Sequence, residues 1–238
     1  MRLSVIVCTS PQRELNLVCC LDRLKQQHFQ DFEVIVVDDG SDAAEQICSQ
    51  GRAHLSLTYQ WRPNDCCLAR SRNIGFQQAS TPGLVFIDSD ILLNPFALDY
   101  YSRLLEHESG GCCVYYGYYG NREFYFSPSL WFHKRTVQWE DGRFPFDPET
   151  GLFRFRTEIF QTPAQFAWGG NFALPRTLYE QLGGFNEQFV GWGREDNEFA
   201  ARTLQAERMD DPGGVPDRLS RRPRTEHRST SKQGRRRF

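Results

Sequence analysis

The chain has 238 residues, 39% of them hydrophobic, and a formal net charge of −2 at pH 7. This length fits one sizeable domain with enough apolar residues to build a core. The near-neutral charge gives no argument for a nucleic-acid partner, and the sequence contains no stretch of roughly 20 apolar residues that could cross a bilayer.

The first elements along the chain alternate between strand and helix. An apolar strand is predicted at residues 3–7, and leucines with helical spacing follow it at Leu17, Leu21 and Leu24. A second apolar strand, residues 33–37, runs directly into acidic residues. This order is typical of a doubly wound nucleotide-binding protein. The sequence has neither a dinucleotide fingerprint nor a P-loop, so a metal ion is expected to hold the phosphates.

The tripeptide Asp88-Ser89-Asp90 is the strongest functional signal, because it follows the apolar run at residues 84–87 directly. In an extended backbone, its two carboxylates lie on the same side. Two neighbouring carboxylates repel each other unless a cation lies between them. Carboxylate oxygens suit Mg²⁺ or Mn²⁺, which usually also binds substrate phosphates. The alternative is a turn that merely caps the next helix.

The remaining helices and strands continue the alternation. Helices are predicted at residues 42–50, 65–79 and 95–108, before Leu182 and from about Asp196, and strands at residues 55–59 and 112–119. Residues 121–165 differ, because they are rich in aromatic residues and have no clean period. Most of these aromatic side chains are expected to pack in the core, with Trp131, Phe132 and Trp139 as candidates for an acceptor site.

Residues 207–238 form a basic tail with a net charge of about +5, whereas residues 1–206 carry about −7. The tail lacks apolar periodicity and is predicted to be disordered, with peripheral membrane contact as one role for its charge. Six of the eight cysteines stand in adjacent pairs, and no Cys-x-x-Cys is present. This pattern favours reduced thiols in a cytoplasmic protein, as does a first strand that leaves no room for a signal peptide.

Several segments together resemble one known family. They are residues 4–7, 36–41, 69–75, 88–90 and 183–185, and their order and spacing resemble the family 2 glycosyltransferases, which are inverting enzymes with the GT-A fold. Residues 191–196 resemble a segment of β-1,4-galactosyltransferases and of bacterial chondroitin-type polymerases. The resemblance covers residues 3–206 and implies an α/β fold, with a Rossmann-like, mostly parallel central sheet flanked by helices. The predicted domain is residues 1–206.

The resemblance also implies a role for each matched position. The nucleotide site would comprise Thr9, Ser10, Asp39, Arg72, Asn73 and Asp88, with Asp39 on the uracil and Asp88 on the ribose or donor sugar. Asp90 would bind Mn²⁺ or Mg²⁺. Asp196 would be the general base, with Glu195 as second candidate. The acceptor or donor-sugar pocket would include Trp168, Gly170, Asn171 and Trp192.

Simpler roles remain open for some of these residues. Arg72 could pair with a nearby acid, and Asn73 could cap a turn. Glu195 and Asp196 could be ordinary first-turn acids, which the helix dipole favours.

The predicted function is metal-dependent, inverting transfer of a sugar from a UDP-sugar to a glycan or lipid-linked acceptor. Galactose or N-acetylgalactosamine is favoured by the resemblance of residues 191–196. A second hypothesis is a sugar nucleotidyltransferase. Such enzymes carry a basic glycine-rich loop at the position of residues 8–13, and the sequence of this chain there argues against that hypothesis. A third is a UDP-sugar-binding module with a truncated C-terminus. Many relatives supply a further metal ligand from a downstream His, and here that position falls to His227 in the tail.

Overall fold

The computed structural model describes residues 1–107, 113–117, 146–147, 152–153, 162–191 and 193–210. A six-stranded sheet with the order β3-β2-β1-β4-β8-β5 forms its centre. The strands are β1 (Leu3–Thr9), β2 (Phe32–Asp39), β3 (Leu57–Arg62), β4 (Gly83–Asp88), β5 (Tyr115–Tyr116) and β8 (Asn171–Pro175). The first four strands run parallel, and β8 is antiparallel to both β4 and β5. A separate pair joins β6 (Phe146–Asp147) to β7 (Leu152–Phe153).

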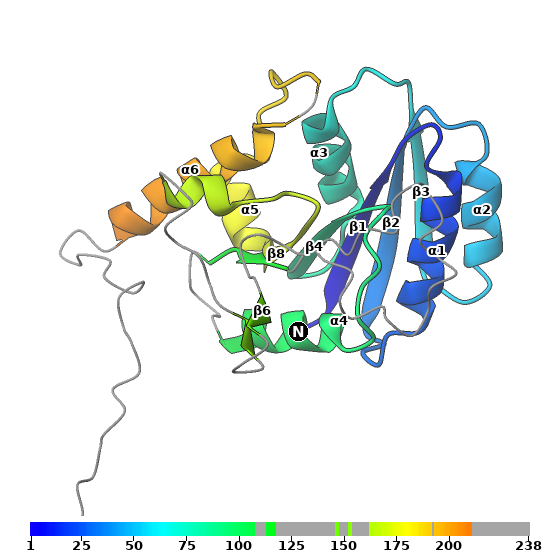
Figure 1. Cartoon of the computed structure of the whole chain (residues 1–238), viewed down its shortest axis with the longest axis horizontal. Helices are drawn as coiled ribbons and strands as arrows, with labels where there is room; N and C mark the ends of the chain where they lie inside the picture. The colour runs from blue at the N-terminus through cyan, green and yellow to red at the C-terminus, as the bar shows by residue number, and fades with distance from the viewer. Residues whose placement is uncertain (108–112, 118–145, 148–151, 154–161, 192, 211–238) are drawn as a thin grey trace, which may run out of the picture.

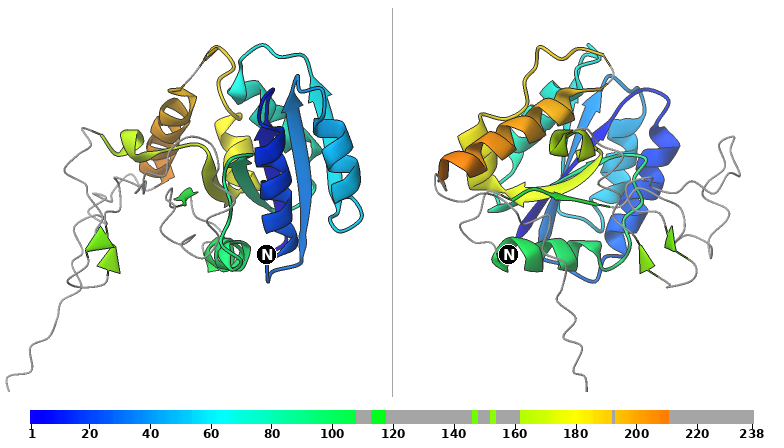
Figure 2. Two further views of the ribbon diagram at one scale, coloured as in Figure 1. Left: turned by 45° about the vertical axis from the view of Figure 1, so that its right-hand side comes forward. Right: turned by 60° about the vertical axis from the view of Figure 1, so that its left-hand side comes forward.

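Helices cover both faces of the sheet (Figure 1). They are α1 (Glu14–Lys25), α2 (Ala44–Gly51), α3 (Leu68–Gln78), α4 (Ala97–His107), α5 (Arg176–Leu182) and α6 (Glu195–Asp210), with a short 3₁₀ helix, η4 (Pro163–Phe166). Two pairs lie side by side, α1 with α2 and α5 with α6 (Figure 2). The predicted α/β architecture with a mostly parallel, helix-flanked sheet is therefore confirmed.

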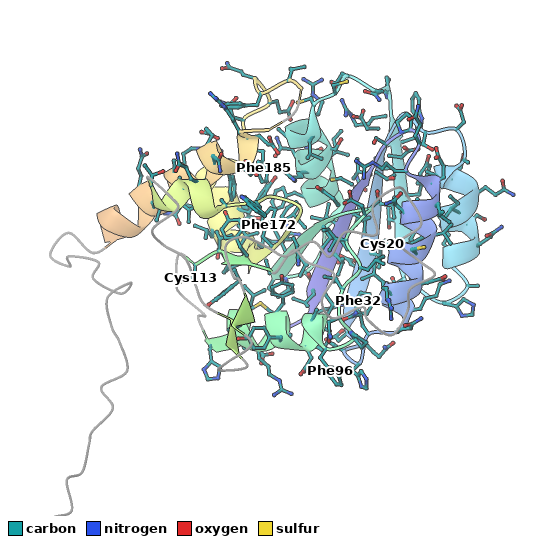
Figure 3. The ribbon with its side chains drawn as sticks, in the orientation of Figure 1. Cys20, Phe32, Phe96, Cys113, Phe172 and Phe185 are labelled. Carbon is teal, nitrogen blue, oxygen red and sulfur yellow. The ribbon has the colours of Figure 1, made fainter. Side chains whose placement is uncertain are left out.

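The core has two parts, one on each face of the sheet. One part packs α1, α2 and α4 against the sheet and includes Cys20 and Phe32. The other packs α3, α5 and α6 and includes Phe172 and Phe185 (Figure 3). Strands β1, β2 and β4 are almost continuously apolar because helices bury them on both faces.

Some element bounds differ from the sequence predictions. Strand β3 begins at Leu57 and runs to Arg62, so the predicted strand at residues 55–59 is wrong at both ends. The polar side chains near the end of β3 gave no apolar pattern from which its true end could be predicted. An edge strand tolerates them because it needs less apolar burial than a central strand. Of the predicted strand at residues 112–119, the structure describes only the short β5 as strand. Helix α6 continues to Asp210, past the predicted domain end at residue 206.

Other predictions depend on residues that the structure does not describe. The aromatic candidates Trp131, Phe132 and Trp139 lie outside the described residues, as do Trp192 and the tail from residue 211 onward. The cysteines of the described part are all free. Within that same part, no helix is both long and apolar enough to span a membrane.

Candidate active site

The site lies at the carboxyl ends of β1, β2 and β4, which are neighbours in the sheet. The strand register puts Thr9 opposite Asp38 and Cys8 opposite Asp88. The backbone N–H of Ser89 donates to the carbonyl of Cys8 at 2.9 Å. The chain ends of three parallel strands thus bring the predicted residues after β1, β2 and β4 to one edge, where open α/β sheets bind ligands.

Asp88 and Asp90 lie in different surroundings at this edge. The Asp88 side chain is 35% exposed, yet its Oδ1 is buried and has no hydrogen-bond partner among the described residues. Burial raises the pKa of Asp88 to about 6, while the Arg72 guanidinium 3.6 Å away opposes that rise. Asp90 is more exposed, and its Oδ2 lies 2.5 Å from Nη1 of Arg13. Sequence reasoning missed Arg13, because nothing in its local pattern indicates this partner.

These two carboxylates fit a divalent cation that is shared with a substrate. Within the described residues, no group of three or more His, Cys, Asp and Glu side chains is arranged to hold a metal ion. Mg²⁺ usually takes one or two carboxylates and completes its shell with water and substrate phosphates. Oδ1 of Asp88 is buried, accepts no hydrogen bond from the described residues and has Nη2 of Arg72 3.6 Å away, and the carboxylate of Asp90 is more exposed. Together these two acids match that kind of donor set. His227, the further ligand suggested by the resemblance, lies outside the described residues.

Arg72 is the central buried cation of the site. Only 1% of its surface is exposed. Its Nη1 donates to Oε1 of Glu195 at 2.9 Å, and its Nη2 donates to the carbonyl of Gly169 at 2.8 Å. The guanidinium also lies 5.0 Å from the ring centroid of Phe185. Because a buried guanidinium stays charged and needs partners, Arg72 connects α3 to the start of α6 and to the loop before β8.

The Gly169-Gly170 dipeptide makes backbone hydrogen bonds to both Asp88 and Asp196. The backbone N–H of Gly169 donates to Oδ2 of Asp196 at 3.0 Å. The carbonyl of Gly170 accepts the backbone N–H of Asp88, also at 3.0 Å. The other oxygen of Asp196 accepts the N–H of Asn197 at 2.7 Å. Asp196 is therefore held on two sides and is tied, through one dipeptide, to the strand end that carries Asp88.

Glu195 and Asp196 differ in their availability. Glu195 is 5% exposed, and its carboxylate is paired with Arg72. Asp196 is half-buried, and among the described residues only backbone N–H groups donate to its two oxygens. Of the two predicted candidates, Asp196 is thus the more exposed acid and makes no ion pair with Arg72, whereas Glu195 balances the buried charge of Arg72.

Asp39 is buried at the end of β2 and pairs with Arg62 at the end of β3. The Nη1 of Arg62 donates to Oδ1 of Asp39 at 2.6 Å and to Oγ of Ser71 at 3.1 Å. Burial raises the pKa of Asp39, while Arg62 opposes the rise. Sequence reasoning missed Arg62, although the register of β2 and β3, which sets Asp39 opposite Arg62, would have found it.

Asn73 is fully engaged in packing a turn. Its Nδ2 donates to the carbonyl of Phe185 and to Oε1 of Glu187, both at 2.9 Å. Its Oδ1 accepts the Tyr179 hydroxyl at 2.7 Å and the Phe185 N–H at 2.8 Å. These four bonds use the donors and acceptors of the amide, so the geometry supports the alternative in which Asn73 holds a turn.

The other predicted pocket residues lie around the same dipeptide. Gly170 is buried, and Trp168 is half-buried. Asn171 is 5% exposed, and its Oδ1 accepts the hydroxyl of Tyr101 at 2.8 Å, which ties β8 to α4. Thr9 is buried at the end of β1, and the adjacent Ser10 is partly exposed.

Gly169→Ala is expected to disturb the site through packing. A Cβ at Gly169 would lie 2.8 Å from Nη2 of Arg72 and 3.0 Å from Cβ of Asp196. Overpacking of this kind costs about 1–3 kcal/mol, and here it would push Asp196 and Arg72 away from the new methyl group. Urea denaturation should therefore show a lower free energy of unfolding. Gly51→Ala is the control, because its new methyl would meet only movable leucine side-chain ends. Equal stability of both variants would contradict tight packing at Gly169.

The sheet of parallel strands with acids at its carboxyl edge defines a doubly wound α/β protein, a class that binds ligands at that edge. The model of Glycosyl transferase family 2 matches residues 4–183, and the chain belongs to this family. A second model, described as the N-terminal domain of galactosyltransferase, matches residues 155–227. The resemblance inferred from the sequence is therefore confirmed.

Curated relatives extend beyond this chain. Validoxylamine A glucosyltransferase of Streptomyces hygroscopicus subsp. jinggangensis is 31% identical over 214 residues, which cover 81% of this chain and 47% of the relative. Chondroitin synthase of Escherichia coli is 24% identical over 229 residues, which cover 84% of this chain and 32% of the relative. The chain thus spans between about a third and a half of the length of these two relatives.

Solved structures support the GT-A fold. The crystal structure of S. aureus TarS 1-349 matches with a TM-score of 0.61 and 22% identity, covering 85% of this chain and 55% of that one. Mannosyltransferase PcManGT from Pyrobaculum calidifontis, in complex with GDP-Man and Mn²⁺, matches with a TM-score of 0.54 and 20% identity, covering 87% and 52%. The predicted fold class is confirmed by these matches and the family model.

Proposed function

We propose that this protein is an inverting, metal-dependent glycosyltransferase that moves a sugar from a UDP-sugar to a hydroxyl group of a glycan or lipid-linked acceptor. The observation that carries the proposal is the connection of Asp88 to Asp196 through the Gly169-Gly170 dipeptide. It sets a strand-end acid pair and a held, accessible carboxylate within one site, and membership of Glycosyl transferase family 2 supports the chemistry.

On the donor side, Asp90 and Oδ1 of Asp88, which accepts no hydrogen bond from the described residues, would hold Mn²⁺ or Mg²⁺ together with the diphosphate. The bound cation would neutralise the charge that gathers on the departing UDP. Arg13, whose guanidinium contacts Asp90, would provide a second positive charge near the same phosphates. Thr9 and Ser10 would supply backbone contacts to the nucleotide, because they end the strand between β2 and β4.

On the acceptor side, Asp196 would act as the general base. Inversion requires that the acceptor hydroxyl attack from the face opposite the leaving group, and that hydroxyl must lose its proton. The N–H groups of Gly169 and Asn197 hold the two carboxylate oxygens in place. Arg72 and Glu195 would act as a positioning pair, because their ion pair fixes the start of α6.

The donor sugar is proposed from the resemblance of residues 191–196 and from the galactosyltransferase model, which together favour galactose or N-acetylgalactosamine. The structural neighbour TarS has been solved with UDP and with UDP-GlcNAc, which supports uracil as the base. A cytoplasmic location, and peripheral membrane contact through the basic tail, stay predictions.

Calorimetric titration with UDP, in the presence and absence of Mn²⁺, tests this proposal without knowledge of the acceptor. UDP should bind tightly only with the cation, because two acids at the strand end repel a bare diphosphate. Equal UDP affinity with and without Mn²⁺ would contradict the proposed role of the metal. Binding of GDP as tightly as UDP would contradict the proposed base.

Asp39→Ala is expected to weaken the binding of UDP and to reduce the preference of the site for UDP over CDP. An ionised carboxylate can accept the N3–H of uracil, whereas cytosine has no proton at N3. Loss of a hydrogen bond to a charged group corresponds to about 10–100-fold in affinity. Competition titrations of UDP and CDP measure the ratio. A variant that keeps the parent's preference for UDP would show that another residue reads the base.

A further inference from the structure

Arg62 is a buried charge on the edge strand of the sheet. It is 6% exposed, although β3 has a sheet neighbour on one side only. An arginine at such a strand end can usually extend its guanidinium into water. Here the guanidinium is directed inward instead, to Asp39, Ser71 and Asp65. Burying a charge is costly, so this arrangement needs an explanation.

The buried guanidinium of Arg62 forms an ion pair with Asp39. Nη1 of Arg62 lies 2.6 Å from Oδ1 of Asp39. Ser71 on α3 accepts from the same Nη1, which fixes the guanidinium between β3 and α3. Arg62 and Asp39 also end neighbouring strands in register, so the contact depends on the sheet and not on a mobile loop. One carboxylate oxygen of Asp39 is thereby committed to Arg62, and the other is oriented.

The protonation of Asp39 decides which base it can match. An ionised carboxylate only accepts hydrogen bonds and suits the N3–H of uracil, whereas a protonated carboxyl can donate to N3 of cytosine. Burial raises the pKa of Asp39, and the charges of Asp65 and Asp38 act in the same direction. The charge of Arg62 opposes this rise most strongly, and a hydrogen bond from the backbone N–H of Asp65 also lowers the pKa of Asp39. The neighbouring thiol of Cys8 stays neutral because burial raises its pKa to about 12.

We propose that Arg62 is a positioning residue for base preference: it holds Asp39 as an oriented, ionised acceptor, and so makes the site take UDP in preference to CDP. The inference rests on the proposed function, because it needs a pyrimidine nucleoside diphosphate in this site. In this proposal the Arg62 side chain does not contact the base itself and acts on it through Asp39. Arg62 therefore acts on the choice between bases more than on the diphosphate.

The test compares Arg62→Gln with Arg62→Lys by calorimetric titration of UDP and of CDP at saturating Mn²⁺. The ratio of UDP to CDP affinity should fall by about tenfold or more in the Gln variant, which corresponds to one charge-assisted hydrogen bond. The Lys variant keeps a positive charge beside Asp39, which favours the ionised carboxylate, and should keep the ratio within about threefold of the parent. Arg103→Gln is the matched control, because it removes the same charge from an exposed arginine on α4 that pairs with Asp99.

The pH dependence of the UDP-to-CDP affinity ratio provides a second measurement, which would not change if Arg62 had a purely structural role. As pH falls from about 8 to about 5.5, Asp39 gains a proton at higher pH in the Gln variant than in the parent. As the pH is lowered, the Gln variant should therefore lose its preference for UDP at a higher pH than the parent does. The diphosphate group also titrates, but it is common to UDP and CDP, so its titration cancels in the ratio of their affinities. The Lys variant should follow the parent.

Each outcome decides between the proposals. A folded Gln variant with the parent's ratio and pH profile would overturn the inference and leave the proposed function standing. If the Gln variant does not fold, a Lys variant that loses the UDP preference would overturn it as well, and one that keeps the preference supports it. Absence of both UDP and CDP binding to the parent protein would overturn the proposed function and this inference with it.

Discussion

Replacing Asp196 by Asn is expected to lower the rate of sugar transfer by about 10²–10⁴-fold, the loss that removal of a well-placed general base causes. Asparagine has nearly the same shape, and its one carbonyl oxygen can still accept the N–H of Gly169 or of Asn197, although its NH₂ group cannot accept the other. It has no basic oxygen for the acceptor proton. UDP affinity should stay within about twofold of the parent, because the carboxylate is assigned to the acceptor side.

The measurement is UDP release from a UDP-sugar with acceptor present, paired with calorimetric UDP binding. Glu198→Gln is the matched control, since it removes a carboxylate from the same first turn of α6, where it pairs with Arg202. That control should transfer at the parent rate. An Asp196→Asn variant with near-parent rate would move the role of base to another residue. Simultaneous loss of UDP binding would indicate a structural role for Asp196.

Replacing Asp90 by Asn is expected to remove most of the Mn²⁺-dependent gain in UDP affinity. Loss of an outer partner of a metal ligand already costs about 10–100-fold in metal affinity, and loss of a ligand should cost at least as much. Folding should hold, because Asp90 is 39% exposed and its ion pair with Arg13 is of the surface type, worth about 0–1 kcal/mol.

Two titrations of UDP, with and without Mn²⁺, measure this effect, and a thermal melt checks folding. Asp31→Asn is the control, because Asp31 is an exposed acid that pairs with Arg2 away from the strand-end acids. Its UDP affinity should match the parent in both titrations. An Asp90→Asn variant that retains the full Mn²⁺-dependent gain would remove Asp90 from the metal site.

Much of the fold could be predicted because buried parallel strands have a simple sequence signature. Three segments are apolar or nearly so, because helices cover both faces of the strands they form: residues 3–7, 33–37 and 84–87, with Ser4 and Glu33 as exceptions. The end of such a run is also where ligands bind, so Asp88 and Asp90 stood out without structural information. Edge strand β3 was bounded wrongly, because polar residues are tolerated there.

The partners of the charged residues were harder to predict, because they depend on contacts between distant segments. Arg72 meets Glu195 and Gly169 only once α6 and the loop before β8 have packed on α3. Arg62 meets Asp39 through the register of two strands, and Arg13 meets Asp90 through two loops. No local period carries that information. Sequence reasoning therefore found the acids and missed two of the three cations that balance them.

The most direct test of the account is UDP release by the parent protein with Mn²⁺, measured across a panel of UDP-sugars with and without acceptor glycans. We expect the acceptor to stimulate UDP release from one or a few of these donors, and we expect chelation of the metal to abolish that release. UDP-sugar binding without turnover of any donor would favour the binding module over the enzyme. Neither binding nor turnover of any UDP-sugar, with the metal present and the protein folded, would contradict the account.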